Sequence, residues 1–512
     1  MSRRRQRRSA QRDRRLASPL LRLPFRRLRN PLPPLERISP QQVEELHRAS
    51  IHILENIGLD FLDEEALRIW EEAGARVDRK RQHVWLDGGL VLEAVSKAPG
   101  VFTWHARNPA RDVIVGGNAI AFAPNSGMVY VSDLDHGRRR ATFADFERFL
   151  KLAQMSNVLH FAGSELVAAS DVPPTFRHLR RMLAAFTLTD KAVRDVAHGR
   201  IIPADNLKMA RIVFGDDLAQ KPVIGGVINV NSPLRYDKRM LGGMMTYARA
   251  GQISIITPFI LAGAMSPITL ASALAQQNAE ALAGIALTQL VNPGAPVIYG
   301  GFTTNTDMKS GSPAFGTPEG AWALLIGAQL ARRYGLPYRG SGSLNTSKVP
   351  DAQAAYEAMW TIWPAVLAHA NFIHHSVGWL ESGLTASFEK FIIDAENLAM
   401  FHHFLKEIII DEDTLALDMI AEVGPGGHHF GTPHTQARYE GEFYEPFLSD
   451  RLNYESWRVA GALDAAQRAN LVWKMLVDEY QAPELDHAIR EALLAYVGRR
   501  ERELEGENLY DE

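Results

Sequence analysis

Residues 296–307 run from an apolar strand into a polar, glycine-rich turn: Pro296-Val-Ile-Tyr-Gly-Gly-Phe-Thr-Thr-Asn-Thr-Asp307. The same order recurs twice downstream, where residues 338–341 lead into the turn 342–348 and residues 372–376 lead into the turn 378–383. Long segments with helical spacing of apolar residues separate these strands. Repeated strand–loop–helix units are typical of an α/β fold that is built on a parallel sheet.

Further segments extend the pattern toward both ends of the chain. We expect additional strands at residues 159–163, 193–197, 223–227 and 254–257, and an eighth near 426–431. Seven or eight such units in roughly 300 residues favour a (β/α)8 TIM barrel over a doubly wound sheet. No G-x-G-x-x-G motif follows an early strand and no G-x-x-x-x-G-K-S/T motif occurs. The sequence therefore lacks the glycine-rich loops that usually bind dinucleotides or, in Walker-type sites, phosphates.

The region before these units has a different pattern. Ser39 and Pro40 are suited to the start of a helix that Gly58 ends. Short alternating apolar runs separated by glycine then predict antiparallel hairpins. We therefore expect four regions: an Arg/Pro-rich arm (1–34), an N-terminal α+β subdomain of helices and hairpins (35–140), the TIM-barrel domain (141–500) and an acidic tail (501–512).

The composition excludes several classes of protein. The chain has 512 residues, of which 46% are hydrophobic, and this share is typical of a folded globular protein. It contains no cysteine, which excludes disulfides, thiolate metal sites and cysteine nucleophiles, and agrees best with a cytoplasmic location. No apolar run approaches the length of about 18 residues that would indicate a membrane-spanning helix.

Charge is distributed unevenly along the chain. Residues 1–30 contain twelve arginines and one acid, Asp13, for a net charge of +11, whereas the whole chain has a net charge of −3. An arginine-rich arm can bind nucleic acid or an acidic partner, although a solvated, disordered tail is the simpler interpretation. The acidic remainder argues against nucleic-acid binding and favours an enzyme that acts on small molecules.

The turns that follow the predicted strands contain aromatic and charged side chains. Phe302, Phe315 and Trp379 lie in glycine-rich turns, where core packing explains them less well than it explains aromatic residues on helices. Aromatic faces attract quaternary ammonium groups through cation–π contacts of about 1–2 kcal/mol each when water is excluded. Three charged residues lie in the same set of turns and are further candidates for substrate binding, or are solvated loop charges: Asp307, Lys348 and Glu381.

Two histidine clusters are candidate sites. His374 and His375 are adjacent, so on a strand one would face the barrel interior and the other the helices. A site histidine that donates a hydrogen bond, a structural role and a metal ligand all remain open for this pair. The spacing lacks the i, i+4 geometry of a helical zinc site, and we expect no metal. His428, His429 and His434 are interpreted as a loop cluster beside the glycine-rich residues 424–427.

Several long motifs, in order along residues 35–500, resemble the trimethylamine methyltransferase family. They are Ser266-Pro-Ile-Thr-Leu-Ala with Gln276-Gln-Asn-Ala-Glu280, Pro293-Gly-Ala-Pro-Val-Ile-Tyr-Gly-Gly301, Gly316-Thr-Pro-Glu319, Asp351-Ala-Gln-Ala-Ala-Tyr-Glu357, Asn371-Phe-Ile-His-His-Ser-Val-Gly-Trp-Leu-Glu381 and Gly424-Pro-Gly-Gly-His-His-Phe-Gly431. The arginine-rich arm lies outside the resemblance.

The resemblance implies a TIM-barrel methyltransferase that moves a methyl group from a methylated amine to the Co(I) of a separate corrinoid protein. Archaeal trimethylamine enzymes of this family contain pyrrolysine, and the corresponding place aligns with residues 345–348 here, which are ordinary amino acids. The chain therefore looks closer to the branch without pyrrolysine, which includes glycine betaine methyltransferases. The corrinoid would belong to the partner, because this chain has no convincing cobalamin-binding signature. Catalytic residues are not assigned.

A quaternary amine releases a methyl group as a neutral tertiary amine, so no protonating residue is needed. The resemblance then implies an aromatic cradle of Phe302, Phe315 and Trp379, with one histidine of the 374–375 pair binding a substrate carboxylate. Two alternatives stay open: a different enzyme that uses Glu381 and a histidine as acid and base, and a binding protein without catalysis. A homo-oligomer is compatible with the sequence.

Overall fold

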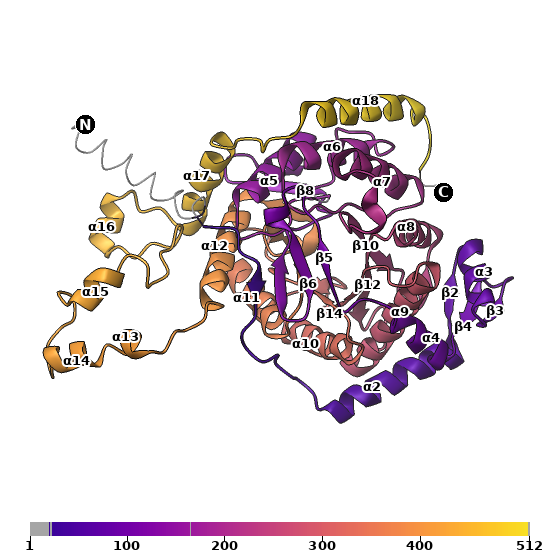
Figure 1. Cartoon of the computed structure of the whole chain (residues 1–512), viewed down its shortest axis with the longest axis horizontal. Helices are drawn as coiled ribbons and strands as arrows, with labels where there is room; N and C mark the ends of the chain where they lie inside the picture. Colours follow the sequence, from indigo (N-terminus) through magenta and orange to yellow (C-terminus); the bar gives the residue numbers. More distant parts are fainter. Residues whose placement is uncertain (1–19, 21–22, 164, 510–512) are drawn as a thin grey trace.

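The computed structural model describes residues 20, 23–163 and 165–509. Most of the arginine-rich arm (residues 1–19, 21 and 22) and the end of the acidic tail (residues 510–512) lie outside the described residues, so their predicted character is not tested. Figure 1 shows a body in which helices surround strands, and a segment that projects from one side of this body. Within the described part of the chain, no helix combines the length and apolar character needed to cross a membrane.

The largest sheet in the described residues has nine strands. Its order is β1-β7-β17-β16-β13-β12-β14-β15, with β10 paired to β12. The pairs along β7, β17, β16, β13, β12 and β10 are all parallel. The bounds are β1 Leu28–Arg29, β7 Ala119–Phe122, β10 Gly225–Val230, β12 Ile253–Ala262, β13 Val297–Gly300, β14 Phe302–Thr306, β15 Pro313–Ala314, β16 Tyr338–Ser341 and β17 Phe372–His374.

Helices follow these strands in the order that the sequence predicts. They are α8 Lys238–Arg249, α9 Leu270–Val291, α10 Pro318–Arg333, α11 Ala352–Leu367 and α12 Phe388–Phe404. Helix α9 is rich in apolar residues and is buried over most of its length, including polar residues such as Gln277 and Glu280, which is typical of a helix enclosed by neighbours on all sides. The prediction of an α/β protein is therefore confirmed.

Two short segments lie between β7 and β10. The His160 amide donates to the Phe122 carbonyl oxygen (2.9 Å), and Phe161 forms a single parallel bridge with Ala192. The Asp195 amide then donates to the Gly225 carbonyl oxygen (3.1 Å). These segments coincide with the strands predicted at 159–163 and 193–197, but they make isolated contacts rather than regular ladders.

Two strand predictions need correction. Residues 119–122 belong to the short apolar runs within residues 35–140 that are expected to form antiparallel hairpins, yet they form β7, which pairs in parallel with β17 of the main sheet. Residues 426–431 were expected to form an eighth strand, but they form an exposed turn between short helices. The segment is Gly-Gly-His-His-Phe-Gly, in which Phe430 is the single large apolar residue, so it lacks the apolar residues that would bury it as a strand.

The region before β7 contains helices and small strands as predicted. These are α2 Pro40–His52, the π-helix Ile53–Ile57, α3 Glu64–Glu72, α4 Gly88–Val95, β2 Leu59–Phe61, β3 Arg76–Asp78, β4 His83–Trp85, β5 Val101–Trp104, the 3-10 helix Pro109–Arg111 and β6 Val113–Gly116. Ser39 caps α2 in a reciprocal capping box with Gln42, as its position before Pro40 predicted. β2, β3 and β4 join β11 (Arg235–Tyr236) in a separate four-stranded sheet, and β5 pairs with β6.

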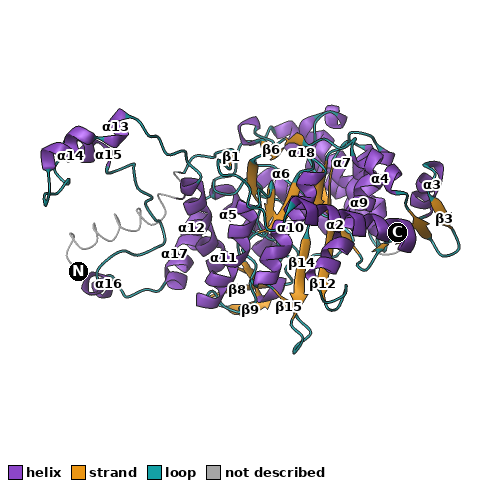
Figure 2. Ribbon diagram, turned by 90° about the horizontal axis from the view of Figure 1, so that it is seen from below, coloured by secondary structure: helices purple, strands orange, loops and turns teal. Residues whose placement is uncertain are grey.

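The remaining elements complete the body. A further sheet has the order β18-β19-β8-β9. The bounds are β8 Tyr130–Asp133, β9 Gly137–Arg140, β18 Trp379–Leu380, β19 Thr385–Ser387, α5 Phe143–Met155, α6 Arg177–Leu188, α7 Ile201–Phe214, α17 Ala465–Asp478 and α18 His487–Glu503, with 3-10 turns at Asp217–Ala219 and Glu381–Gly383. Between α12 and α17 the chain projects away from the body, through α13 Glu412–Leu415, α14 Leu417–Val423, α15 Pro433–Arg438 and α16 Tyr454–Val459 (Figure 2).

Candidate active site

The predicted site turns meet at one edge of the main sheet. β13, β16 and β17 are parallel neighbours, so the turns that follow them leave from the same edge. The carboxyl ends of parallel strands are where α/β proteins usually assemble their sites, because the following loops converge there. The chain thus brings together residues that are more than 70 positions apart.

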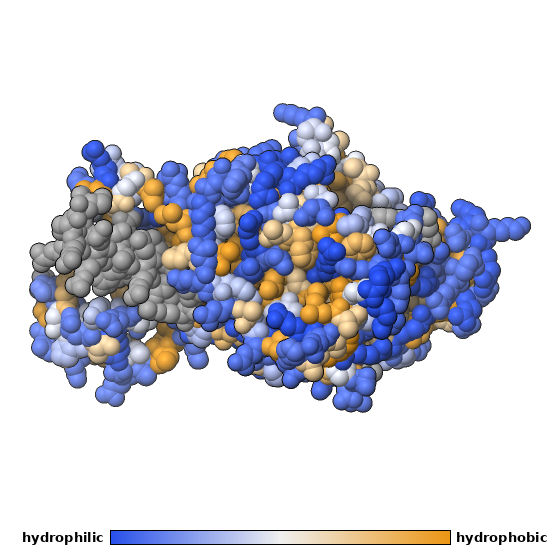
Figure 3. Space-filling model, turned by 90° about the horizontal axis from the view of Figure 1, so that it is seen from above, coloured by the Kyte–Doolittle hydropathy of each residue, from blue (hydrophilic) through white to orange (hydrophobic). Residues whose placement is uncertain are grey.

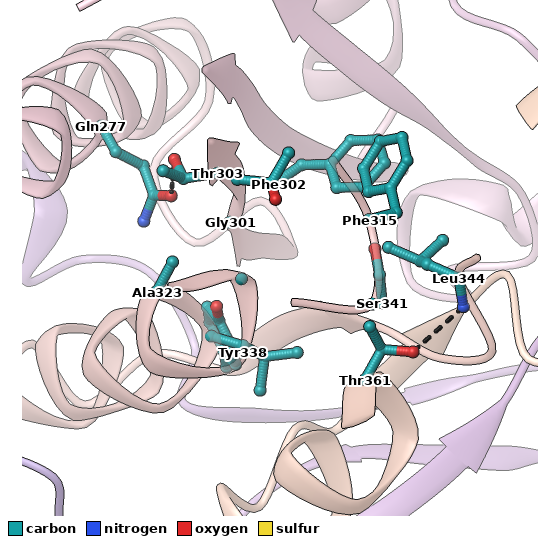
Figure 4. Close-up of a pocket in the computed structure, with 14 residues that line it drawn as sticks. Gln277, Gly301, Phe302, Thr303, Phe315, Ala323, Tyr338, Ser341, Leu344 and Thr361 are labelled. Atoms are coloured by element: carbon teal, nitrogen blue, oxygen red, sulfur yellow. Dashed lines mark hydrogen bonds between the residues drawn. The ribbon is translucent and has the colours of Figure 1, made fainter. Parts of the chain in front are cut away.

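Three predicted aromatic residues form a cluster at this edge. The rings of Phe302 and Phe315 stack with centroids 5.6 Å apart, and Trp379 meets Phe315 edge-on at 5.5 Å. The centroid of the His375 ring lies 4.6 Å from that of Trp379 and 5.6 Å from that of Phe302. Figure 4 shows the two phenylalanine rings side by side at the wall of a small cavity.

The aromatic cluster is held in place by bonds between the turns. The indole Nε1 of Trp379 donates to the Asn345 carbonyl oxygen (3.0 Å), and the Asn345 side-chain amide donates to the Trp379 carbonyl oxygen. The Gly378 amide donates to the carboxylate of Asp394 on α12 (2.9 Å), which itself pairs with Lys390. These bonds fix Trp379 relative to the turn that follows β16.

The two adjacent histidines do not alternate as a strand would require. Their rings stack with centroids 3.6 Å apart. The backbone leaves the strand at His375, where φ is +58°, so that both rings turn to the same side. The expected alternation, with one ring toward the barrel interior and the other toward the helices, is therefore not observed. A left-handed conformation in a non-glycine residue costs free energy and is common at functional sites.

His374 lies between two guanidinium groups. Its Nδ1 contacts Nη2 of Arg339 (3.1 Å), its Nε2 contacts Nη2 of Arg194, and Ser126 Oγ lies 3.3 Å from the same Nε2. Burial, reinforced by these positive neighbours, holds the pKa of His374 well below its usual value. The ring is therefore neutral near pH 7, and both of its nitrogens are already in contact with protein groups.

Arg194 and Arg339 are the most unusual groups at this edge. Both are buried, and among the described residues neither forms an ion pair with a carboxylate. Burial lowers the pKa of Arg194 to about 9 and that of Arg339 to about 10. The Nε atom of each is buried and has no hydrogen-bond partner. Buried charge without an ion-pair partner costs several kcal/mol, and an anion bound beside these two cations would offset that cost.

The adjacent carboxylate does not neutralise Arg194. Asp195 follows it directly, but the Asp195 carboxylate accepts from Nε and Nη2 of Arg181 on α6 (3.1 and 3.2 Å) and from Asn206 (3.2 Å). Consecutive residues in an extended segment point to opposite faces. Asp195 therefore belongs to the helix side of the sheet, and Arg194 to the side that holds His374.

The three predicted charged residues make their bonds away from the ring cluster. Asp307 bonds within its own turn, to Ser310 Oγ (2.6 Å) and the Lys309 amide (3.1 Å), and its pKa is lowered by the bond from Ser310. Lys348 is exposed, and its Nζ donates to the Thr346 carbonyl oxygen (2.9 Å). Neither residue is brought to the aromatic rings by these contacts.

Glu381 forms a two-point ion pair with Arg138, with distances of 2.7 Å and 3.1 Å, and accepts a bond from Thr385 (2.6 Å). Burial opposes ionisation of Glu381, but the bonds from Arg138 and Thr385 outweigh it and hold the pKa of Glu381 below its usual value. The carboxylate is therefore ionised and already neutralised by a cation, which makes it a poor general acid at neutral pH.

The cavity beside Phe302 and Phe315 extends toward the helices. Its lining also includes Gln277 on α9, Tyr338 on β16 and Leu344. Thr303 Oγ1 donates to Gln277 Oε1 (2.7 Å), while Gln277 Nε2 is buried without a partner. Figure 4 shows this amide and the Tyr338 side chain on the far side of the cavity from the phenylalanine rings.

Neither of the two histidine clusters named from the sequence has its donor atoms gathered with those of other side chains in the described residues. His374 has guanidinium groups at both ring nitrogens, which would repel a metal cation. His428 and His429 are exposed in the projecting part of the chain. In the part of the chain that the structure describes, one trio of side chains has donor atoms close enough to share an ion: Asp133, Asp135 and His136, in the turn between β8 and β9.

Sequence reasoning missed Arg194 and Arg339. Each lies inside a segment that the sequence predicts to be a buried strand: residues 338–341 form β16, whereas residues 193–197 are an extended segment with isolated contacts. A charged side chain within an apolar strand is costly unless it is paired or functional. That signal was present in the sequence, but its meaning depends on whether a carboxylate lies nearby, which only the fold decides.

Comparison with known proteins gives the family. The model of the family described as trimethylamine methyltransferase (MTTB) matches residues 2–505. A glycine betaine methyltransferase of Desulfitobacterium hafniense (strain Y51) is 42% identical over 475 residues, which cover 92% of this chain and 98% of that protein.

More distant relatives include two trimethylamine methyltransferases. That of Desulfitobacterium hafniense (strain DSM 10664 / DCB-2) is 32% identical, with 92% of this chain and 95% of that protein covered. One from Methanosarcina mazei is 28% identical, with 91% and 96% covered. Because the family model spans nearly the whole chain and two of these relatives exceed 30% identity over almost their full length, this chain belongs to the trimethylamine methyltransferase family.

Proposed function

We propose that this protein transfers a methyl group from a quaternary amine that also bears a carboxylate, a betaine, to the Co(I) of a separate corrinoid protein. The observation that carries the proposal is the pair of buried arginines, Arg194 and Arg339, which form no ion pair with a carboxylate of the described residues and lie beside an aromatic cluster. The 42% identity to a glycine betaine methyltransferase supports the same substrate class.

The charges at the site favour a zwitterion over a simple amine. A guanidinium fork binds a carboxylate through two parallel hydrogen bonds, and such bonds are strongest where water is excluded. Trimethylamine has no carboxylate, so it would leave both arginines unpaired. A protonated or quaternary amine without a carboxylate would also be repelled by them. A betaine supplies the missing anion and presents its cationic nitrogen to the rings.

The rings of Phe302, Phe315 and Trp379 are the groups that we assign to the trimethylammonium end. Aromatic faces stabilise such cations through their quadrupoles, by about 1–2 kcal/mol each in a dry site. Arg339 lies over the Phe302 ring, 4.8 Å from its centroid, which places guanidinium and aromatic surfaces within one small ligand's length. His375, with a buried and unbonded Nδ1, is a further candidate to orient the carboxylate.

The reaction needs no acid or base from the chain. A Co(I) corrinoid, held by the partner protein, would supply the nucleophile that takes the methyl group as the C–N bond breaks. The electron pair of that bond stays on nitrogen, so the product leaves as a neutral tertiary amine. The protein's contribution is then to hold the substrate with one methyl directed toward the partner and to exclude water. Glu381 is ionised and paired with Arg138, which agrees with a site in which no protein group transfers a proton.

We also propose that the main sheet closes into a (β/α)8 barrel with the site at its carboxyl end. The parallel order from β7 to β10 and the isolated contacts at residues 160–161 and 195 support it. The division into an N-terminal region (35–140) and a barrel domain (141–500) is retained as part of this proposal, with β7 contributed by the first region.

Titration calorimetry of the full chain tests the substrate class. Glycine betaine, proline betaine, carnitine and trimethylamine are compared on wild type and on Trp379→Ala, with Tyr356→Ala on the exposed face of α11 as the control. We expect at least one zwitterion to bind and trimethylamine to bind much more weakly. Trp379→Ala should weaken binding of the zwitterion, and the control should not.

Methyl transfer is then followed by the absorbance change of cob(I)alamin or of a reduced corrinoid protein on addition of the bound substrate. Turnover without any corrinoid would favour a different enzyme on this fold. Binding without transfer to any Co(I) acceptor would favour a binding protein. Preferential binding of trimethylamine would overturn the assignment of the two arginines.

A further inference from the structure

Two buried polar groups line the cavity beside the aromatic cluster and have no hydrogen-bond partner among the residues that the structure describes. They are Nε2 of Gln277 and Oγ of Ser341. Gln277 is 1% exposed and Ser341 is 3% exposed, so protein surrounds both. On the face of the molecule that Figure 3 shows, hydrophobic and hydrophilic residues are mixed, as on most protein surfaces. A polar atom that is buried without a bond is much less common, because it has lost its hydrogen bonds to water.

The Gln277 amide lies on the side of the cavity away from the phenylalanine rings (Figure 4). Its Oε1 accepts from Thr303, which fixes the orientation of the amide and leaves Nε2 as the free donor. Two glycines keep the space in front of this amide open. A Cβ at Gly301 or at Gly327 would come within 2.6 Å of the Tyr338 hydroxyl oxygen and within 3.2 or 3.3 Å of Gln277 Nε2.

Ser341 connects the cavity to the arginine pair. It follows Arg339 by two positions on β16, and its register partner on β17 is His374. Residues two positions apart on a strand point to the same face, so the Ser341 hydroxyl shares a face with the Arg339 guanidinium. A ligand carboxylate at Arg339 would therefore place the rest of the ligand beside Ser341.

The size and lining of the cavity select the kind of group that it can hold. Its volume is about 30 Å³. One water molecule needs about 10–15 Å³, so the cavity has room for one or two groups of that size and is too small for a trimethylammonium group. None of the described residues that line it carries a charge, and much of the wall is apolar, including Phe302, Phe315 and Leu344. A neutral hydroxyl on a carbon chain fits this combination, because a hydroxyl both donates and accepts hydrogen bonds.

We propose that this cavity is a subsite for a hydroxyl on the carbon chain of the substrate, with Ser341 Oγ and Gln277 Nε2 as its polar partners. The hydroxyl, together with one water for which the cavity has room, gives both atoms the hydrogen bonds that they lack. The preferred substrate is then a betaine longer than glycine betaine, with a hydroxyl between its carboxylate and its nitrogen. This inference rests on the proposed function, because the arginine pair and the aromatic cluster hold the two charged ends.

Carnitine and γ-butyrobetaine isolate the contribution of the hydroxyl, because the second compound is the first without that group. A site that is built to bond a hydroxyl rejects the analogue that lacks it, since the polar groups of the site are then left unpaired. The two enantiomers of carnitine add a sharper comparison. They have the same composition and the same apolar surface, so a difference between their affinities requires that the protein contacts the hydroxyl in one position.

Titration calorimetry of the full chain with L-carnitine, D-carnitine, γ-butyrobetaine and glycine betaine tests the proposal. We expect one carnitine enantiomer to bind at least about tenfold more tightly than γ-butyrobetaine. In Ser341→Ala this ratio should fall to about one, and Gln277→Met should also lower it, because each variant removes a polar partner of the hydroxyl. Ser254→Ala is the matched control and should leave the ratio unchanged. Ser254 is a buried serine on β12 with an unpartnered hydroxyl, and it lies outside the cavity lining.

Thermal unfolding of the same variants separates a binding defect from misfolding. The Ser341 hydroxyl has no bond to lose, so Ser341→Ala should unfold at the wild-type temperature or above it. Equal binding of γ-butyrobetaine and both carnitine enantiomers would overturn the subsite, as would a preference that both variants retain. Glycine betaine bound more tightly than either carnitine enantiomer would also overturn the subsite but leave the proposed function intact. If no betaine bound at all, the proposed function would fail and the subsite with it.

Discussion

Replacing Arg339 by methionine tests whether this buried arginine binds the substrate carboxylate or stabilises the fold. Met has similar length and no charge, and the site loses one of its two unpaired guanidinium groups. If Arg339 binds a substrate carboxylate, the variant loses two charge-assisted hydrogen bonds, each of about 1.5–3 kcal/mol. A loss of about 3 kcal/mol corresponds to an increase in Kd for a betaine of at least about 100-fold.

Although its affinity for a betaine should fall, the same variant is not expected to lose stability. In the ligand-free protein, Arg339 contacts the Gly301 carbonyl oxygen and His374 Nδ1 (3.1 Å each), and no carboxylate of the described residues compensates its charge. Each of these bonds is worth about 1 kcal/mol net, whereas leaving a charge buried and unpaired costs several kcal/mol. We therefore expect the free energy of unfolding of Arg339→Met to equal or exceed that of wild type.

Calorimetric titration and thermal unfolding measure the two quantities on one preparation. Arg333→Met serves as the control, because Arg333 pairs with Glu44 at the surface (2.6 Å) and lies outside the ring cluster. The reasoning is refuted if Arg339→Met unfolds at a clearly lower temperature than wild type, which would make Arg339 structural. It is also refuted if the variant binds betaines with unchanged affinity.

Two further predictions concern stability. Phe149→Ala should lower the free energy of unfolding by about 3–5 kcal/mol, because its buried ring stacks on Phe388 with centroids 4.2 Å apart; denaturant titration against Tyr356→Ala, at an exposed position, measures this. Burial lowers the pKa of His402 from 6.5 to about 4, so the folded state disfavours the protonated ring. Its contribution is fully present above pH 6.5 and is lost as the pH falls toward 4, by about 3 kcal/mol at most. His402→Asn should therefore flatten the pH dependence of stability in this window, and an unchanged slope would contradict the assignment.

Much of the local structure was predictable because it depends on neighbouring residues. Ser39 and Pro40 predicted the start of α2, and the strand expected at residues 338–341 matches the bounds of β16. Helix caps and buried strands are encoded within a few residues, so pattern and propensity are sufficient to place them. The strand–turn order placed the aromatic residues at 302, 315 and 379 after successive strands, although Phe302 begins strand β14 and Trp379 begins strand β18 rather than lying in turns.

The remaining features required contacts between distant parts of the chain. The sequence of β7 predicts one strand of a hairpin, and only its pairing with β17 places it in the main sheet. Residues 426–431 read as a strand, but they lie in a segment with almost nothing of its own chain to pack against. Periodicity shows which residues prefer burial, not whether a neighbour exists to bury them.

The sequence by itself determined the strand–turn–helix order, the absence of thiols, and the aromatic side chains that follow the strands. The tertiary structure alone decided that Arg194 and Arg339, 145 positions apart, meet at His374, and that the Asp195 carboxylate is directed to Arg181 instead. Whether a charge is compensated depends on distances between side chains, and these distances arise only when the sheet brings separate strands together. For that reason the sequence could suggest a site for a methylated cation, while the buried anion-binding pair emerged from the fold.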